Sequence, residues 1–182
     1  YLWRTIANDS AGNYNSTTQF NYVVNKAAPS LTLLINNTNG DFTINESSTA
    51  NLTGILVSGE SNISLYIGSQ MIKNGSSPLT NITLFNTPGT YVINVSYAET
   101  ANYTQNYASH LLYVNDIGVP LVNLTSPSSG STDPDGDVVF WFNVTDTGIV
   151  SNCSLYINGT FNQSKDIVTQ GLNTFSINGM AN

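Results

Sequence analysis

The sequence predicts an all-β protein built from small β-sandwiches. Three observations lead to this prediction: apolar and polar residues alternate in short runs, turn-forming residues separate those runs, and helical periodicity is absent. Aromatic residues, which pack well in strands, make up 10% of the chain. A length of 182 residues fits two small sandwiches better than one.

The expected strands fall into three groups along the chain. The first group has two strands within residues 1–24, YLWRTIANDSAGNYNSTTQFNYVV. Linkers are expected at 25–29 and 115–120, because each contains a proline, which discourages ladder pairing. The expected strands of the middle group lie near residues 31–36, 50–57, 62–67, 70–72, 79–85, 91–97 and 107–114, and those of the last group near 121–124, 138–145, 153–157, 166–168 and 173–177.

The middle group by itself is large enough for a complete sandwich, since seven strands in roughly 90 residues is the pattern of an immunoglobulin-like domain. The last group follows the same pattern but stops before the final two strands. The start of the chain supplies their counterpart, with Tyr1 aligned to Tyr91 and Trp3 to Ile93. We therefore predict tandem immunoglobulin-like β-sandwiches, one complete (26–115) and one split between the chain ends. In the split domain, residues 1–25 form the last two strands and complete the 116–182 unit of a neighbouring copy.

Several strings carry a family resemblance. CSLYINGT, NTFSING and YLWRTIANDSAGN together resemble immunoglobulin-like repeats of archaeal and bacterial cell-surface and filament proteins, and PGTYVINVSYAETANYT is similar to another bacterial repeat class of this fold. The resemblance covers nearly the whole chain and implies a fold rather than an activity. In the first family a cysteine on the third strand commonly faces one on the penultimate strand. Here Cys153 meets Ala7 at the matching position, so the resemblance implies no such disulfide.

The two parts of the split sandwich have complementary apolar faces. Trp3, Thr5 and Ala7 share one face of a strand at period two, and Cys153, Leu155 and Ile157 share another. These faces can form opposite walls of one core. The residues expected at the contact between copies are Tyr1, Trp3, Thr5, Ala7, Phe20, Tyr22, Cys153, Leu155 and Ile157.

Three routes can close the split sandwich. The sequence can be one period of a longer polypeptide, an excerpt that starts at an arbitrary point of a repeat; its first residue is Tyr and no signal segment precedes it. Alternatively, the first hairpin of one separate molecule completes the next by adding strands, and this contact propagates. Closure within one molecule requires residues 1–25 to pass the whole middle sandwich, for which the linker is short.

Composition excludes several classes of function. Charged residues are 8% of the chain, the net charge is -7, and Lys and Arg total four, so the cation cluster that nucleic-acid binding requires is missing. No apolar stretch approaches the roughly 20 residues of a membrane-spanning helix. The lone His110 has no acid or nucleophile placed beside it by a recognisable motif, so we expect no enzyme activity and no cofactor.

Acceptor triplets for N-linked glycans are unusually frequent. Alternation explains part of this, because Asn and Thr then form the solvent face of strands. It does not explain the choice of Asn, a poor strand former. Glycans would protect the edges of a chain so poor in charge, and they imply an extracellular setting, with an archaeal cell surface expected. The acceptors are Asn8, Asn15, Asn36, Asn45, Asn51, Asn62, Asn74, Asn81, Asn94, Asn102, Asn123, Asn143, Asn152, Asn158 and Asn162.

A dense acidic cluster, Asp133, Asp135 and Asp137, is a weak candidate calcium site, with Asp116 or Asp146 as additional ligands. A Pro-Asp-Gly turn explains the same residues equally well. Strand alternation predicts that Trp141, Tyr66 and Tyr156 point to solvent, where aromatic rings suit protein contacts or stacking on sugars. Cys153 is most simply a buried thiol.

These observations predict a structural repeat unit of an extracellular glycosylated filament, stalk or surface array, whose partners are copies of itself joined head to tail. The alternative is an adhesin or carbohydrate-binding surface module that uses the exposed aromatic residues. A third option is an accessory segment of a large surface enzyme.

Overall fold

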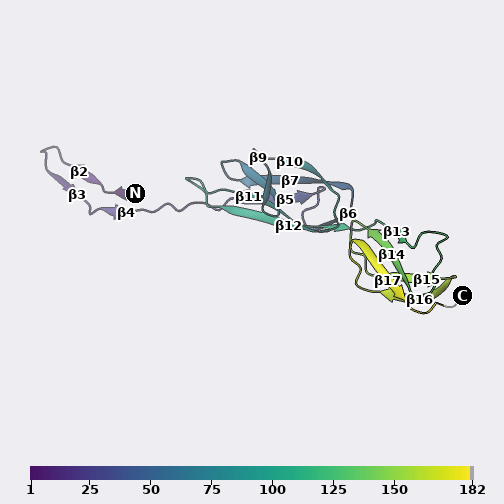
Figure 1. Cartoon of the computed structure of the whole chain (residues 1–182). Helices are drawn as coiled ribbons and strands as arrows, with labels where there is room; N and C mark the ends of the chain where they lie inside the picture. Colours follow the sequence, from purple (N-terminus) through teal and green to yellow (C-terminus); the bar gives the residue numbers. More distant parts are fainter. Residues whose placement is uncertain (181–182) are drawn as a thin grey trace. The chain divides into compact units, whose positions relative to one another are not determined.

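The computed structural model describes residues 1–180, and over that range it contains strands and turns and no helix (Figure 1). The all-β prediction is confirmed. Among the described residues, no helix could cross a lipid bilayer. Two compact units are present: residues 1–39, 52–81 and 93–110 form one, and residues 40–51 and 82–92 with the described residues from 111 onward form the other. Residues 181 and 182 of the predicted last segment lie outside the described range.

The first residues form a twisted antiparallel ribbon. Strands β1 (Leu2–Trp3) and β4 (Phe20–Asn21) pair with each other, as do β2 (Ile6–Asn8) and β3 (Tyr14–Ser16). Every residue from 1 to 28 is exposed. A two-stranded ribbon is marginally stable in water, so this segment needs another surface to cover its apolar side chains.

The middle strands form two sheets. One has the order β10-β7-β5 and the other β6-β12-β11-β8-β9. Their bounds are β5 (Ser30–Ile35), β6 (Phe42–Asn45), β7 (Ser48–Ser58), β8 (Ile63–Ile67), β9 (Gln70–Gly75), β10 (Leu79–Phe85), β11 (Gly89–Tyr97) and β12 (Asn106–Asn115). Strand β6 was not predicted. It is a short edge strand that pairs in parallel with β12, a partner about 70 residues away in sequence, as in Phe42 with Leu112.

An immunoglobulin-like core lies between these two sheets. Apolar side chains from β5, β7 and β10 meet those from β8 and β11, and alternation along each strand directs every second residue inward. Gly54 on β7 marks the closest approach, because a Cβ there would lie 2.6 Å from Val95 Cγ2. The buried residues of this layer are Leu33, Ile35, Leu52, Ile63, Leu65, Leu79, Ile93, Val95 and Tyr97.

The last strands form a smaller pair of sheets. A three-stranded sheet has the order β13-β14-β17, and β15 pairs with β16. The bounds are β13 (Leu121–Ser126), β14 (Val138–Thr145), β15 (Cys153–Ile157), β16 (Thr160–Lys165) and β17 (Gly171–Ile177). Phe142 and Phe175 stack with ring centroids 5.0 Å apart, and Val144 and Val150 complete the buried cluster.

The strand predicted at 166–168 was wrong. Asn158 and Gly159 both have positive φ and form a tight turn, so the chain returns as β16 immediately, at Thr160. Asn-Gly is a strong signal for a two-residue hairpin, and the prediction overlooked it.

Candidate assembly site

An internal repeat defines the geometry of the candidate site. In the β8–β9 hairpin, Ile63 lies opposite Gly75 and Ile67 opposite Gln70, with an irregularity after Leu65. In the β15–β16 hairpin, Cys153 lies opposite Lys165 and Ile157 opposite Thr160, with the irregularity after Leu155. Each residue of the β8–β9 hairpin differs by 90 in residue number from its counterpart in the β15–β16 hairpin. The two hairpins are therefore equivalent, and the sheet β13-β14-β17 matches β5-β7-β10 in strand order.

The equivalence stops at the next strand. In the middle sandwich β8 pairs on one side with β9 and on the other with β11, with Ile93 opposite Ile67, Val95 opposite Leu65 and Tyr97 opposite Ile63. Over residues 116–180, β15 pairs with β16 alone. One edge of β15, at the position that β11 takes beside β8, is thus available for another strand.

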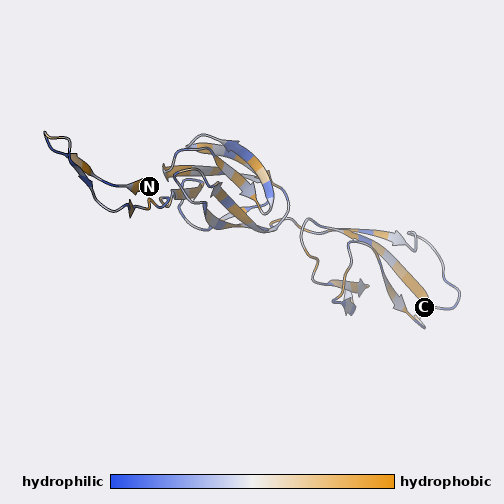
Figure 2. Ribbon diagram, turned by 90° about the vertical axis from the view of Figure 1, so that its left-hand side faces the viewer, coloured by the Kyte–Doolittle hydropathy of each residue, from blue (hydrophilic) through white to orange (hydrophobic). Residues whose placement is uncertain are grey.

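An apolar cavity of about 490 Å³ lies between the last two sheets. Most of its apolar walls come from β13, β14, β15 and β17, and Leu124 in the lining is 81% exposed. In the hydropathy colouring of Figure 2, hydrophobic segments recur along these strands and along the first hairpin. The lining includes Val122, Leu124, Phe140, Phe142, Leu155 and Phe175. Apolar walls this exposed are a candidate surface for a further apolar segment.

The first hairpin has one aromatic face. Trp3 lies opposite Phe20, and their rings stack with centroids 5.4 Å apart. Tyr1 and Tyr22 exchange backbone hydrogen bonds of 2.7 Å, so their side chains share this face by cross-strand pairing. Trp3 is 54% exposed and Phe20 50%. The register shifts by one residue between these pairs and the pair Ala7–Asn15. The structure therefore places Tyr1, Trp3, Phe20 and Tyr22 on one face, and the place of Thr5 and Ala7 on that face stays a prediction.

The remaining predicted contact residues lie on β15. Cys153, Leu155 and Ile157 are half-buried and alternate with exposed Ser154 and Tyr156. Cys153 is a free cysteine, and burial raises the pKa of its thiol. The residues that the sequence prediction missed are the β13 positions Val122 and Leu124. Their alternation was visible, but both lie in a short strand beside a predicted linker.

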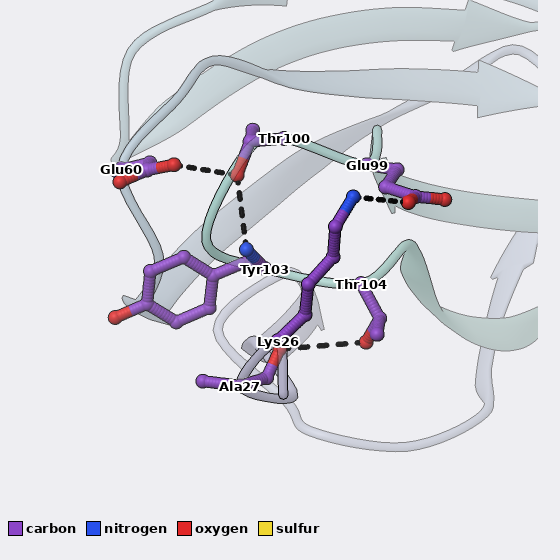
Figure 3. Close-up of polar contacts among 7 residues, drawn as sticks. All are labelled: Lys26, Ala27, Glu60, Glu99, Thr100, Tyr103 and Thr104. Carbon is purple, nitrogen blue, oxygen red and sulfur yellow. Dashed lines mark hydrogen bonds and ion pairs between the residues drawn. The ribbon is translucent and has the colours of Figure 1, made fainter. Parts of the chain in front are cut away.

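A polar clip holds the segment that follows the hairpin (Figure 3). Ala27 donates to Asn102 O at 2.8 Å and accepts from the Thr104 amide at 3.0 Å, and Lys26 forms an ion pair with Glu99. Glu60 braces the same loop, because Thr100 Oγ1 donates to its Oε1 at 2.6 Å and Asn102 Nδ2 to its Oε2 at 2.8 Å.

The hydrogen bonds from Asn102 and Thr100, in that order, lower the pKa of the Glu60 carboxyl, so it stays ionised in mildly acidic solution.

The glycan acceptors are accessible to different extents. Ten of the fifteen predicted asparagines are exposed, and the five half-buried ones are Asn36, Asn51, Asn81, Asn94 and Asn143. Accessibility is required for an N-linked glycan. Occupancy of these sites stays a prediction.

The acidic residues form two groups of different character. Asp137 Oδ1 accepts a hydrogen bond from Gly179 N, and Asp135 Oδ1 accepts one from Asp137 N. Desolvation, together with the charges of Asp146 and Glu46, raises the pKa of Asp116. Within residues 1–180 no three His, Cys, Asp or Glu side chains are grouped as a metal site would require. Calcium at Asp133, Asp135 and Asp137 stays a prediction.

The three predicted solvent-facing aromatic residues differ in their surroundings. Trp141 is exposed on β14, and Tyr156 makes an edge contact with Phe161, with ring centroids 5.8 Å apart. Tyr66 is half-buried and lines a groove with Tyr107. His110 lies 3.0 Å from Asn39 Oδ1.

Comparisons with known proteins yield structural similarities to solved chains. The chain resembles the fibronectin(III)-like modules of CbhA from Clostridium thermocellum at a TM-score of 0.40 and 15% sequence identity, over 79% of this chain and 77% of that chain. No protein-family model matches the sequence. No curated protein matches it either. The fold assignment therefore rests on the strand order and burial of this chain itself.

Proposed function

We propose that the chain is a non-catalytic structural repeat unit of an extracellular glycosylated filament, stalk or surface array. Copies are joined head to tail, because residues 1–25 of one copy complete the sandwich begun by residues 116–182 of another. The observation that carries the proposal is the 90-residue repeat: β15 matches β8 in register but has an available edge where β8 pairs with β11.

The repeat also predicts the register of the contact. Subtracting 90 from the β11 numbers and adding 90 to the β8 numbers turns the pair Ile93–Ile67 into Trp3–Ile157, and the pair Tyr97–Ile63 into Ala7–Cys153. The aromatic face of the hairpin then turns toward the apolar cavity. Full burial of each ring contributes on the order of 2 kcal/mol, which favours association over an exposed hairpin.

The form of the assembly follows from the contact. One copy contributes its first hairpin and the other its last sheets, so the contact is heterologous and extends into a linear array unless a ring closes. The same contact arises if further copies follow in one longer polypeptide. Backbone ladders and packed cores would carry load along the array.

Glycans suit this role. The accessible acceptors are spread over all three groups of strands, and the chain has few charges to prevent edge pairing. Surface sugars would keep the exposed sheet edges of neighbouring molecules apart. N-linked glycans also imply that the protein lies outside the cell.

Disulfide trapping tests the proposal. In Ala7→Cys, the new thiol lies opposite native Cys153 of the next copy, so oxidation at pH 8.5 should give a ladder of covalent oligomers on a non-reducing gel. The alkaline pH offsets the raised pKa of Cys153. Ile6→Cys, on the opposite face of the same strand, is the matched control and should stay monomeric.

Two results would overturn the proposal. A disulfide formed within single molecules of Ala7→Cys would indicate closure inside one chain. Equal ladders from Ala7→Cys and Ile6→Cys would indicate collisions without a specific register. Adding Cys153→Ser to Ala7→Cys should abolish the ladder.

An adhesin or carbohydrate-binding module is the second candidate function. The contact between the exposed rings of Tyr156 and Phe161, which are 61% and 54% accessible, favours it, because such rings suit sugar faces or a protein partner. Specific retention on an immobilised polysaccharide, lost in Tyr156→Ser, would support this candidate.

A further inference from the structure

A groove crosses the outer face of the five-stranded sheet. Two adjoining cavities of about 640 and 380 Å³ share the lining residues Tyr66, Ser96 and Tyr107. Tyr66 stands on β8 and Tyr107 on β12, the two strands that flank β11. Between them, β11 supplies Asn94 and Ser96 as the floor.

Strand register places Asn94 beside a tyrosine. Asn94 lies opposite Tyr66, and Ser96 lies opposite Ser64. Directly opposed side chains on one sheet face have Cβ atoms about 5 Å apart. Tyr107 is 72% exposed. A group attached to the Asn94 amide would therefore leave the sheet between two aromatic walls.

The chemistry of the lining selects a neutral polar ligand. No charged residue lines either cavity; hydroxyl, amide and tyrosine groups do, with one alanine and one glycine. Tyrosine faces cover the apolar faces of sugar rings, while hydroxyl and amide groups bond sugar hydroxyls. This combination suits a saccharide.

We propose that the groove holds the first sugars of an N-linked glycan on Asn94, packed between Tyr66 and Tyr107. Asn94-Val95-Ser96 is an acceptor triplet. Asn74, another acceptor on this face, already donates to Ser64 Oγ at 2.7 Å and to Ile63 O at 3.3 Å. The inference rests on the glycosylated state proposed above and adds a site where the glycan becomes part of the folded domain.

A thermodynamic cycle tests this site on the full chain, secreted from a host that installs N-linked glycans. Glycopeptide mass spectrometry first measures occupancy at each acceptor. Asn94→Gln should then lower the unfolding temperature of the middle sandwich by about 4 °C, a shift typical of one modest interaction in a domain of this size. In a Tyr66→Ser, Tyr107→Ser background the same change should have no effect. Asn45→Gln, an exposed acceptor on edge strand β6, is the control and should give equal shifts in both backgrounds.

The outcomes separate the two proposals. Suppose that Asn94 carries a glycan but Asn94→Gln lowers the unfolding temperature equally in the wild-type and double tyrosine backgrounds. The groove proposal then fails and the glycoprotein proposal stands. If other acceptors are occupied and Asn94 is not, the groove proposal also fails. If no acceptor is occupied in protein from its natural source, both fail.

Two further measurements complete the test. If the double tyrosine variant does not fold, nuclear Overhauser contacts between the tyrosine rings and the anomeric proton of the first sugar decide the question: their presence supports the site and their absence overturns it. Saturable binding of free N,N′-diacetylchitobiose to Asn94→Gln, lost in Tyr66→Ser, would assign the groove to an external saccharide and overturn the attachment at Asn94.

Discussion

At the scale of single residues, Gly54 shows how closely the two middle sheets approach. A Cβ at this position would meet Val95 Cγ2 at 2.6 Å and Ile63 Cδ1 at 3.2 Å, both in the buried core. The corresponding position of the last sheets, 90 residues later, is the fully buried Val144. The two sandwiches thus fill their cores differently at equivalent positions.

Gly54→Ala should destabilise the middle sandwich by about 1 to 3 kcal/mol, because the added methyl forces packed side chains and backbone apart. Urea unfolding followed by tyrosine fluorescence measures the change. Val57→Ala on the same strand, where the side chain is 66% exposed, is the control and should change stability by less than about 0.5 kcal/mol. Equal effects of the two changes would contradict the packing described for Gly54.

The stability of the fold should depend on pH through the carboxyl group of Glu60. Its folded-state pKa is lowered from 4.5, first by Asn102 and then by Thr100. A carboxyl whose pKa is lower in the folded state than in the unfolded state stabilises the fold at pH values above its unfolded-state pKa. This contribution is lost as the pH falls through the folded-state pKa. We expect Glu60→Gln to reduce stability at pH 7 and to have a much smaller effect at pH 3. Denaturant midpoints at the two pH values measure this.

Glu99→Gln is the matched control for Glu60→Gln. It removes the exposed ion pair with Lys26, which should contribute little at either pH. An effect of Glu60→Gln that persists undiminished at pH 3 would show that the carboxylate charge is not what braces the loop.

At the scale of elements, the first hairpin combines a well-formed turn with an exposed aromatic face. Asp9 Oδ1 accepts hydrogen bonds from the amides of Ala11 and Asn13, at 3.0 and 2.8 Å, which closes the turn between β2 and β3. The pairing of β1 with β4 then brings Trp3 against Phe20. The contacts that shape this element therefore all lie within residues 1–22.

Trp3→Ala should weaken self-association at least 30-fold, corresponding to about 2 kcal/mol, because a large aromatic residue at the centre of an interface dominates its affinity. Sedimentation velocity over a concentration series measures the effect. Leu2→Ala, which removes an exposed residue from the opposite face, is the control and should leave association unchanged within about threefold. Equal loss in both variants would argue against the aromatic face as the contact.

At the scale of the whole molecule, the two sets of sheets differ in how much core they have. The middle strands bury apolar side chains from two sheets, whereas the last strands bury a smaller cluster of Phe142, Val144, Val150 and Phe175. Stability rises with buried apolar area. The last sheets should therefore depend on an added hairpin far more than the middle sandwich does.

Calorimetry should resolve two unfolding transitions, of which the lower belongs to the last sheets. Because binding to the folded state raises its unfolding temperature, the lower transition should rise with protein concentration and the upper one should not. In Trp3→Ala the lower transition should lose this dependence. One cooperative transition that is insensitive to concentration would contradict the proposed division of stability.

Much of the fold followed from alternation in the sequence. The strands near 62–67 and 153–157 were located closely, because each has a plain apolar-polar period bounded by turn residues. The same rule predicted one face for Trp3, Thr5 and Ala7, and the structure adds the pairing of Trp3 with Phe20. The predicted contact between that face and β15 stays a prediction.

One element of the fold and one groove depended on tertiary structure. Strand β6 exists because residues Phe42–Asn45 find an edge on β12. Strand β16 was missed for a different reason, because the local turn signal of Asn158 and Gly159 was overlooked. Tyr66 and Tyr107, 41 positions apart, flank Asn94 only because β8 and β12 take places on either side of β11.

The sequence by itself determined most of the segments that are strands and which side of each is apolar, because both are properties of a single segment and its period of two. Only the tertiary structure decided which strands are neighbours and in what register. It also decided which polar side chains meet at the polar clip around Glu60 and in the groove between Tyr66 and Tyr107. Neighbour choice depends on packing between segments distant in the chain, and no local pattern encodes that packing.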